Sequence, residues 1–174
     1  MFSTGDVLLY TAPRLTFANL VPRLIRLVTG NKIVHVALYI EPEINDKHFI
    51  LEALFDGVYI KAYSEAELYE RMNGFKLYGV ARLPNVTVNA NALVSFAMRY
   101  NNKKYGILTI LNLLLQHGKT RLFPRKKWSV WFKSKDAYTC SELTQLALEE
   151  YFNPAKAAAL VEPDDYLGKP WKIT

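Results

Sequence analysis

Three residues far apart in the sequence have the side chains that a thiol hydrolase needs: Cys140, His35 and Glu52. Cys140 is the only cysteine, in the stretch YTCSEL. Apolar residues three or four apart follow it and predict a helix that begins at or just after Cys140: Leu143, Leu146, Ala147 and Tyr151. The unpaired N–H groups and dipole of a helix start favour a thiolate. The alternative is a small buried apolar residue.

His35 and Glu52 fall in two apolar segments that have the composition of strands, VHVALYI and FILEAL. If these strands pair, Glu52 falls beside His35, because cross-strand neighbours lie about 5 Å apart. A nucleophile, a base and a carboxylate that orients the base form the constellation of a cysteine hydrolase. Each residue also has an ordinary interpretation: a hydrogen-bonded core histidine and a strand glutamate that points to water.

The remaining pattern predicts an α+β domain, with a mainly antiparallel sheet and packed helices, over residues 1–174. Polar turns separate the segments, and Asp56-Gly57 indicates a hairpin. Ser64 and Glu67 have the spacing of a capping box. The expected strands are 5–10, 34–40, 48–53, 58–62 and 75–83, and the expected helices are 13–28 with a kink at Pro22, 64–73, 89–100, 107–116 and the helix after Cys140.

Composition places the chain among globular proteins, since 51% of its residues are apolar and 13% are aromatic. A single cysteine forms no internal disulfide, which fits a reducing compartment. The N-terminus lacks the pattern of a secretory signal. The longest apolar run, 107–115, is too short to cross a bilayer. We therefore expect a cytoplasmic location.

These segments resemble the NlpC-type superfamily of papain-fold cysteine peptidases and amidases. GDVLLY, VHVALYI and FILEAL are similar to its successive strands, and TCSEL is similar to the start of its cysteine helix. The cysteine here follows the histidine, as in the circularly permuted YiiX/YebB-like branch. The helix end LVTG and the tail PDDYL also resemble that branch. The chain departs from the family in lacking a glycine after Cys140-Ser141.

The resemblance implies a permuted papain-like fold in which Cys140 is the nucleophile, His35 the base and Glu52 the third member. NKKYG resembles a family turn whose tyrosine lies near the nucleophile, which makes Tyr105 a candidate for the oxyanion side, with Asn102 in place of the family's glycine. Tyr138 competes for that role, and we expect Tyr138 and Ser141 to contact substrate.

By the same resemblance the substrates are peptides, such as those of bacterial cell walls. Acyl transfer or hydrolysis on lipids or lipoproteins is an alternative on the same fold. A module of another class would be catalytically idle and bind an anionic surface. No cofactor or metal is expected, because His48 and His117 lack partners at ligand spacing and no phosphate-binding glycine loop occurs.

A basic, aromatic-rich insertion at about 118–136 is the second departure from the family. Seven Lys and Arg residues and no acids lie between Lys119 and Lys135, so the rest of the +6 chain is close to neutral. Trp128 and Trp131 are interspersed among them. The segment could bind an anionic membrane, bind a phosphate-rich polymer without specific nucleic-acid recognition, or be a lid with solvated charges.

Overall fold

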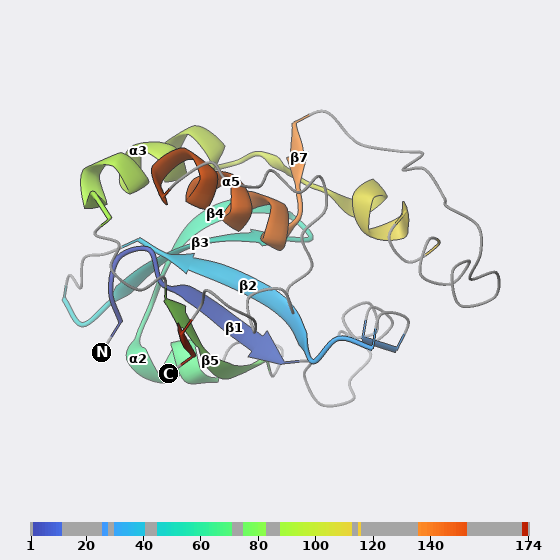
Figure 1. Cartoon of the computed structure of the whole chain (residues 1–174). Helices are drawn as coiled ribbons and strands as arrows, with labels where there is room; N and C mark the ends of the chain where they lie inside the picture. The colour runs from blue at the N-terminus through green and yellow to red at the C-terminus, as the bar shows by residue number, and fades with distance from the viewer. Residues whose placement is uncertain are drawn as a thin grey trace.

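The fold is a mainly antiparallel sheet with helices on both faces, here taken from a computed structural model (Figure 1). Six strands are ordered β4-β3-β2-β1-β5-β8, and β6 and β7 form a separate parallel pair. The structure describes residues 2–11, 26–27, 30–40, 45–70, 75–82, 88–112, 115, 136–152 and 172–173. Within these, the strands are β1 Val7–Thr11, β2 Ile33–Tyr39, β3 His48–Leu54, β4 Gly57–Tyr63, β5 Lys76–Arg82, β6 Lys104–Tyr105, β7 Ala137–Tyr138 and β8 Lys172–Ile173.

The sheet divides the core into two clusters, and helices cover the sheet on both faces (Figure 1). Helices α3 (Ala90–Tyr100) and α5 (Cys140–Phe152) cover one face, where Val36 and Leu38 pack against Leu143. Helix α2 (Glu65–Tyr69) covers the other, where Leu68 belongs with Ala37 and Tyr39. Successive β2 side chains therefore alternate between two buried faces. This explains why the VHVALYI segment is apolar at nearly every position.

Strand β2 pairs along its length with β1 but only briefly with β3. The β2–β3 register comprises Leu38 opposite Leu51 and Tyr39 opposite Ile50. Pairing with β3 thus involves only the C-terminal end of β2 and does not include His35, and α5 contacts both strands. We conclude that the N-terminal turn of α5 approaches the sheet where β2 and β3 have parted.

The predicted β3–β4 hairpin forms, but its two turn residues are Phe55 and Asp56, because Gly57 already pairs with Leu54 as the first residue of β4. Gly57 has φ +147°, a conformation that L side chains rarely adopt, and an added Cβ would meet the Lys103 carbonyl oxygen at 3.0 Å. The Val58 N–H donates to that same oxygen, and the Asn102 N–H donates to the Val58 carbonyl. These bonds attach the segment after α3 to β4.

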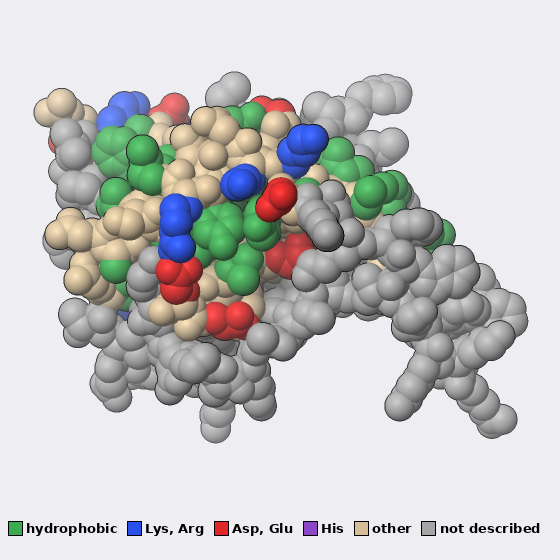
Figure 2. Space-filling view, turned by 90° about the horizontal axis from the view of Figure 1, so that it is seen from above, with side chains coloured by type: hydrophobic (Ala, Val, Ile, Leu, Met, Phe, Trp, Pro, Cys, Tyr) green, Lys and Arg blue, Asp and Glu red, His purple; other side chains and the backbone are tan. Residues whose placement is uncertain are grey.

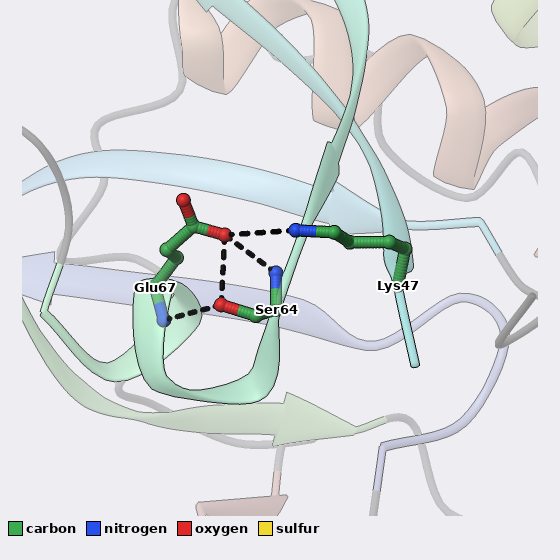
Figure 3. A network of polar contacts seen from close by, with 3 residues as sticks. All are labelled: Lys47, Ser64 and Glu67. Carbon is green, nitrogen blue, oxygen red and sulfur yellow. Dashed lines mark hydrogen bonds and ion pairs between the residues drawn. The ribbon is translucent and has the colours of Figure 1, made fainter. Parts of the chain in front are cut away.

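Helix α2 begins with the predicted capping box (Figure 3). The Ser64 hydroxyl accepts a hydrogen bond from the Glu67 N–H, and the Glu67 carboxylate accepts one from the Ser64 N–H at 2.7 Å. Lys47 lies 3.5 Å from the same carboxylate oxygen. Because both capping bonds form, the short helix starts at a defined residue directly after β4.

An ion pair joins the start of β1 to the end of β5. The Asp6 carboxylate is buried, and both of its oxygens lie 2.6 Å from Arg82 nitrogens. Its Oδ2 atom also accepts the Ser3 N–H at 2.7 Å. A buried carboxylate needs such donors, so this bidentate pair fixes the entry of the chain into the sheet.

The mixed α and β content and the mainly antiparallel sheet confirm the predicted α+β class, and the permuted papain-like fold stays a prediction. Strands β6, β7 and β8 were not predicted. The expected helix 13–28 and the basic insertion lie mostly or wholly outside the described residues. The expected helix 107–116 is helical at 107–112 and at Leu115. In the part of the chain that the structure describes, no helix is long and apolar enough to cross a membrane.

Candidate active site

His35 and Glu52 are in direct contact in the interior of the protein. The His35 Nε2 atom lies 3.1 Å from Glu52 Oε2, and the two residues are 6% and 1% exposed. The centroid of the imidazole ring also lies 5.9 Å from that of the Tyr10 ring and 5.8 Å from that of the Phe75 ring. Burial excludes water from the pair, and the aromatic walls restrict rotation of the ring.

Cys140 reaches His35 from the other side of the sheet. It is 5% exposed and belongs to the core cluster beneath α5, whereas His35 packs on Tyr10 of the opposite cluster. The two side chains are nevertheless hydrogen-bonded to each other. This contact is possible because β2 and β3 separate at this position.

A capping box also fixes the start of α5. The Thr139 hydroxyl accepts from the Glu142 N–H at 3.3 Å, and Glu142 Oε2 accepts from the Thr139 N–H at 2.9 Å. The TCSE sequence has the spacing of a capping box, with Thr139 three residues before Glu142. Cys140 is therefore the first residue of the helix, at the end where the helix dipole favours an anion.

The surroundings of Cys140 favour the thiolate. Burial by itself raises the pKa of the thiol, but the hydrogen bond and charge of His35 and the N–H groups of Val36 and Ser141 lower it below its usual value. For His35, burial lowers the pKa, but hydrogen bonds to Cys140 and Glu52 raise it above its ordinary value. Both shifts favour a thiolate beside an imidazolium.

Tyr63 is a member of this cluster that sequence reasoning missed. Its hydroxyl donates to Glu52 Oε1 at 2.7 Å, so both carboxylate oxygens have partners. Tyr63 lies at the end of β4 and is opposite His48 in the β3–β4 register. Nothing in the sequence distinguished it from the other ten tyrosines.

Tyr105 and Tyr138 are neighbours in the parallel β6–β7 pair but differ in environment. Burial raises the pKa of Tyr105 well above its ordinary value, and charge on Cys140 and Glu142 raises it further. Burial also raises the pKa of Tyr138, but the next cause is Tyr100, to which Tyr138 is hydrogen-bonded. Of the two candidates, Tyr105 is the one whose hydroxyl is influenced by the cysteine.

Two backbone features place Tyr105 next to the start of α5. Asn102 has φ +63°, the left-handed conformation that glycine prefers and asparagine tolerates. The Gly106 N–H donates to the Tyr138 carbonyl at 3.0 Å. A Cβ on Gly106 would lie 3.2 Å from Thr139 N, so only glycine allows this approach without a shift.

Of the predicted site residues, the structure brings together Cys140, His35, Glu52 and Tyr105. Ser141 is buried and contributes its backbone N–H to the sulfur, and the substrate contacts expected of Ser141 and Tyr138 stay predictions. Tyr138 is half-buried against Tyr100, with ring centroids 5.0 Å apart. Among the residues that the structure describes, no group of three potential ligands could hold a metal ion.

The sequence was compared with models of protein families and with curated proteins. The chain matches no protein-family model, and no curated protein is significantly similar to it in sequence.

Proposed function

We propose that this protein is a cysteine hydrolase of the permuted NlpC type, which cleaves an amide through an acyl-enzyme on Cys140. The observation that carries the proposal is the hydrogen-bonded series from Cys140 to His35 to Glu52. A core histidine needs no buried carboxylate and no thiol as partners, and a lowered thiol pKa serves a nucleophile.

In the first half of the reaction, the Cys140 thiolate attacks the substrate carbonyl carbon and a C–S bond forms. Nε2 of His35 faces Glu52, which leaves Nδ1 to carry the proton between sulfur and substrate. The imidazolium gives this proton to the leaving amine, and the C–N bond breaks. The acidic partner of the pair is thus the proton source for the leaving group.

In the second half, His35 takes a proton from water, which attacks the thioester carbonyl and releases a carboxylic acid and the thiolate. The Cys140 N–H and the Tyr105 hydroxyl are the donors proposed for the oxyanion. The raised pKa of Tyr105 keeps its hydroxyl protonated at neutral pH, as a donor must be. Glu52 keeps the imidazole in one orientation throughout.

Peptide amides are the first substrate class to test, and one surface feature favours acylated substrates as a second. The helical residues after Gly106 bury polar Thr109 and Asn112 while Ile107, Leu108 and Leu111 are about half exposed, at 47%, 51% and 50%. Figure 2 shows hydrophobic side chains at the surface on its right side, over the segment that follows β6. These residues follow Gly106, which lies against Thr139, and an exposed apolar surface suits a fatty acyl chain.

The experiment that tests the proposal is capture of the acyl-enzyme. The protein is incubated separately with peptides from bacterial peptidoglycan and with phospholipid vesicles, quenched in acid, and analysed by mass spectrometry. A peptidyl mass on Cys140 supports the amidase, and a fatty acyl mass supports the lipid alternative. Cys140→Ser and His35→Ala are the controls. Absence of any adduct and of any product with both substrates would favour the catalytically idle module.

A further inference from the structure

Tyr63 is hydrogen-bonded to Glu52 but has no role in the reaction proposed above. Its hydroxyl donates to Oε1 of the carboxylate at 2.7 Å, while Oε2 lies 3.1 Å from His35. We propose that Tyr63 is a positioning residue that holds Glu52 ionised and oriented toward His35, and so sets the pH range in which Cys140 is nucleophilic. This inference rests on the proposed function.

The physical argument begins with the burial of Glu52, which is 1% exposed. A carboxylate loses hydration in such a position and remains charged only where donors replace water. A hydrogen bond to an ionised group is stronger than a neutral one, and it favours the charged form over the neutral form. Tyr63 is a donor on the side of the carboxylate away from His35, so it supports the charge that stabilises the imidazolium.

Tyr63 donates to Glu52 although it lies four residues along β4 from Tyr59, the residue that pairs with Glu52. The residue directly opposite Glu52 in the β3–β4 register is Tyr59, yet its hydroxyl donates to the Asp56 carbonyl at 2.9 Å. Tyr63 is opposite His48, and its ring packs with the cluster beneath α2. Tyr59 and Tyr63 therefore lie on the same face of β4, and it is Tyr63, the more distant one, whose hydroxyl donates to Glu52.

Other titratable groups around this cluster have different partners or positions. Tyr10 of β1 lies with its ring against the imidazole. His48 of β3 is hydrogen-bonded to Tyr39 of β2 at 3.0 Å. Glu67 of α2 is engaged in the capping box with Ser64. Glu52, Cys140 and Tyr63 are therefore the groups through which we expect the protonation of His35 to be controlled.

The test is the rate of Cys140 alkylation by iodoacetamide as a function of pH, in wild type and in Tyr63→Phe. Phenylalanine keeps the ring in the cluster and removes only the donor. We expect the alkylation midpoint to rise by about half to one pH unit, which is roughly a three- to tenfold slower reaction below the midpoint. Tyr59→Phe, which removes a hydroxyl that faces Asp56, is the matched control and should keep the wild-type midpoint.

A double-mutant cycle separates positioning from packing. If Tyr63 acts through Glu52, then Tyr63→Phe should have little effect in a Glu52→Gln background, whereas a packing role gives additive effects. Should Tyr63→Phe lower the melting temperature, 3-fluorotyrosine at position 63 provides a second variant. It is a stronger donor, and the expected midpoint moves in the opposite direction.

The outcomes also distinguish this inference from the function on which it rests. If the alkylation midpoint rises in His35→Ala but is unchanged in Tyr63→Phe, the role proposed for Tyr63 is wrong and the proposed hydrolase function is unaffected. Additive effects in the cycle do the same. A wild-type midpoint equal to that of an ordinary thiol, and insensitive to His35→Ala, overturns both.

Discussion

Glu52 Oε2 lies 3.1 Å from His35 Nε2, although the two residues are not opposite each other in the sheet. Extending the register from Leu38 opposite Leu51 would place Glu52 opposite Ala37. Glu52 therefore reaches His35 diagonally, at a point where the strands no longer pair. Cys140 contacts His35 from the α5 side at this same point. We infer that the separation of β2 and β3 explains both the diagonal contact of Glu52 with His35 and the contact of Cys140 with His35.

The first prediction concerns the pH dependence of Cys140. Its lowered pKa means that the sulfur loses its proton at a pH below that of an ordinary thiol, about 8.5, and regains it as the pH falls through the lowered value. Alkylation should thus reach its plateau at a lower pH than alkylation of an ordinary thiol does. In His35→Ala the largest stabilising partner of the thiolate is lost while burial remains, so the midpoint should rise by at least about one unit.

Hydrolysis should show a narrower pH range than alkylation. Alkylation needs only the thiolate, but cleavage also needs the proton of His35, whose raised pKa marks the upper limit. A bell-shaped rate profile beside a sigmoidal alkylation profile is the expected pair of curves. Identical profiles for both reactions would contradict the assignment of His35 as proton donor.

Tyr105→Phe is the second prediction, and it addresses stabilisation of the oxyanion. Removing one such donor typically costs about a hundredfold or more in kcat, so hydrolysis of a p-nitrophenyl ester should fall by roughly that factor. The iodoacetamide rate, which involves no oxyanion, should stay near the wild-type value. Tyr138→Phe provides a comparison on the adjacent strand, and its loss should be smaller because its hydroxyl bonds to Tyr100.

The third prediction concerns folding stability at α2 (Figure 3). Ser64→Ala removes the hydroxyl that caps the helix, and urea denaturation should show a loss of about 1 kcal/mol. Lys47→Ala, which removes the exposed ion pair with the same carboxylate, should cost less. Equal losses in the two variants would contradict the capping interpretation.

The same helix gives a dependence on pH. Hydrogen bonds from the Ser64 backbone and then its side chain lower the pKa of Glu67. This stabilisation is present above the ordinary carboxyl pKa and is lost as the pH falls through the lowered value. The difference between wild type and Ser64→Ala should therefore shrink in acid.

Sequence patterns predicted the parts of this fold that depend on local regularities. Alternation and apolar runs gave β1 to β5, and the capping pair gave the start of α2, because these signals lie within a few residues. The separation of β2 from β3 has no local signal, since it lies between two segments that are distant from each other in the sequence. Tyr63 was missed for the same reason: its hydroxyl acts on a residue of another strand, and not on the one directly opposite.

Gly106→Ala is the last prediction, and it tests the link between β6 and the cysteine helix. The new methyl group would lie 3.2 Å from Thr139 N, Thr139 Cγ2 and the Tyr138 carbonyl carbon. Two of these are backbone atoms, so the chain just before Cys140 must shift, and a cost of about 1–3 kcal/mol in stability is expected. Because the shift is transmitted to Cys140, alkylation at neutral pH should slow as well.

Thr139→Ser offers a matched rescue of this variant. Serine lacks Cγ2 but keeps the hydroxyl that accepts the Glu142 N–H, so the cap of α5 is retained. In the Gly106→Ala background it should restore part of the stability and of the alkylation rate, while Thr139→Ser alone should change both little. A Gly106→Ala protein that melts lower but keeps the wild-type alkylation rate would mean that the approach of β6 supports the fold and does not position the nucleophile.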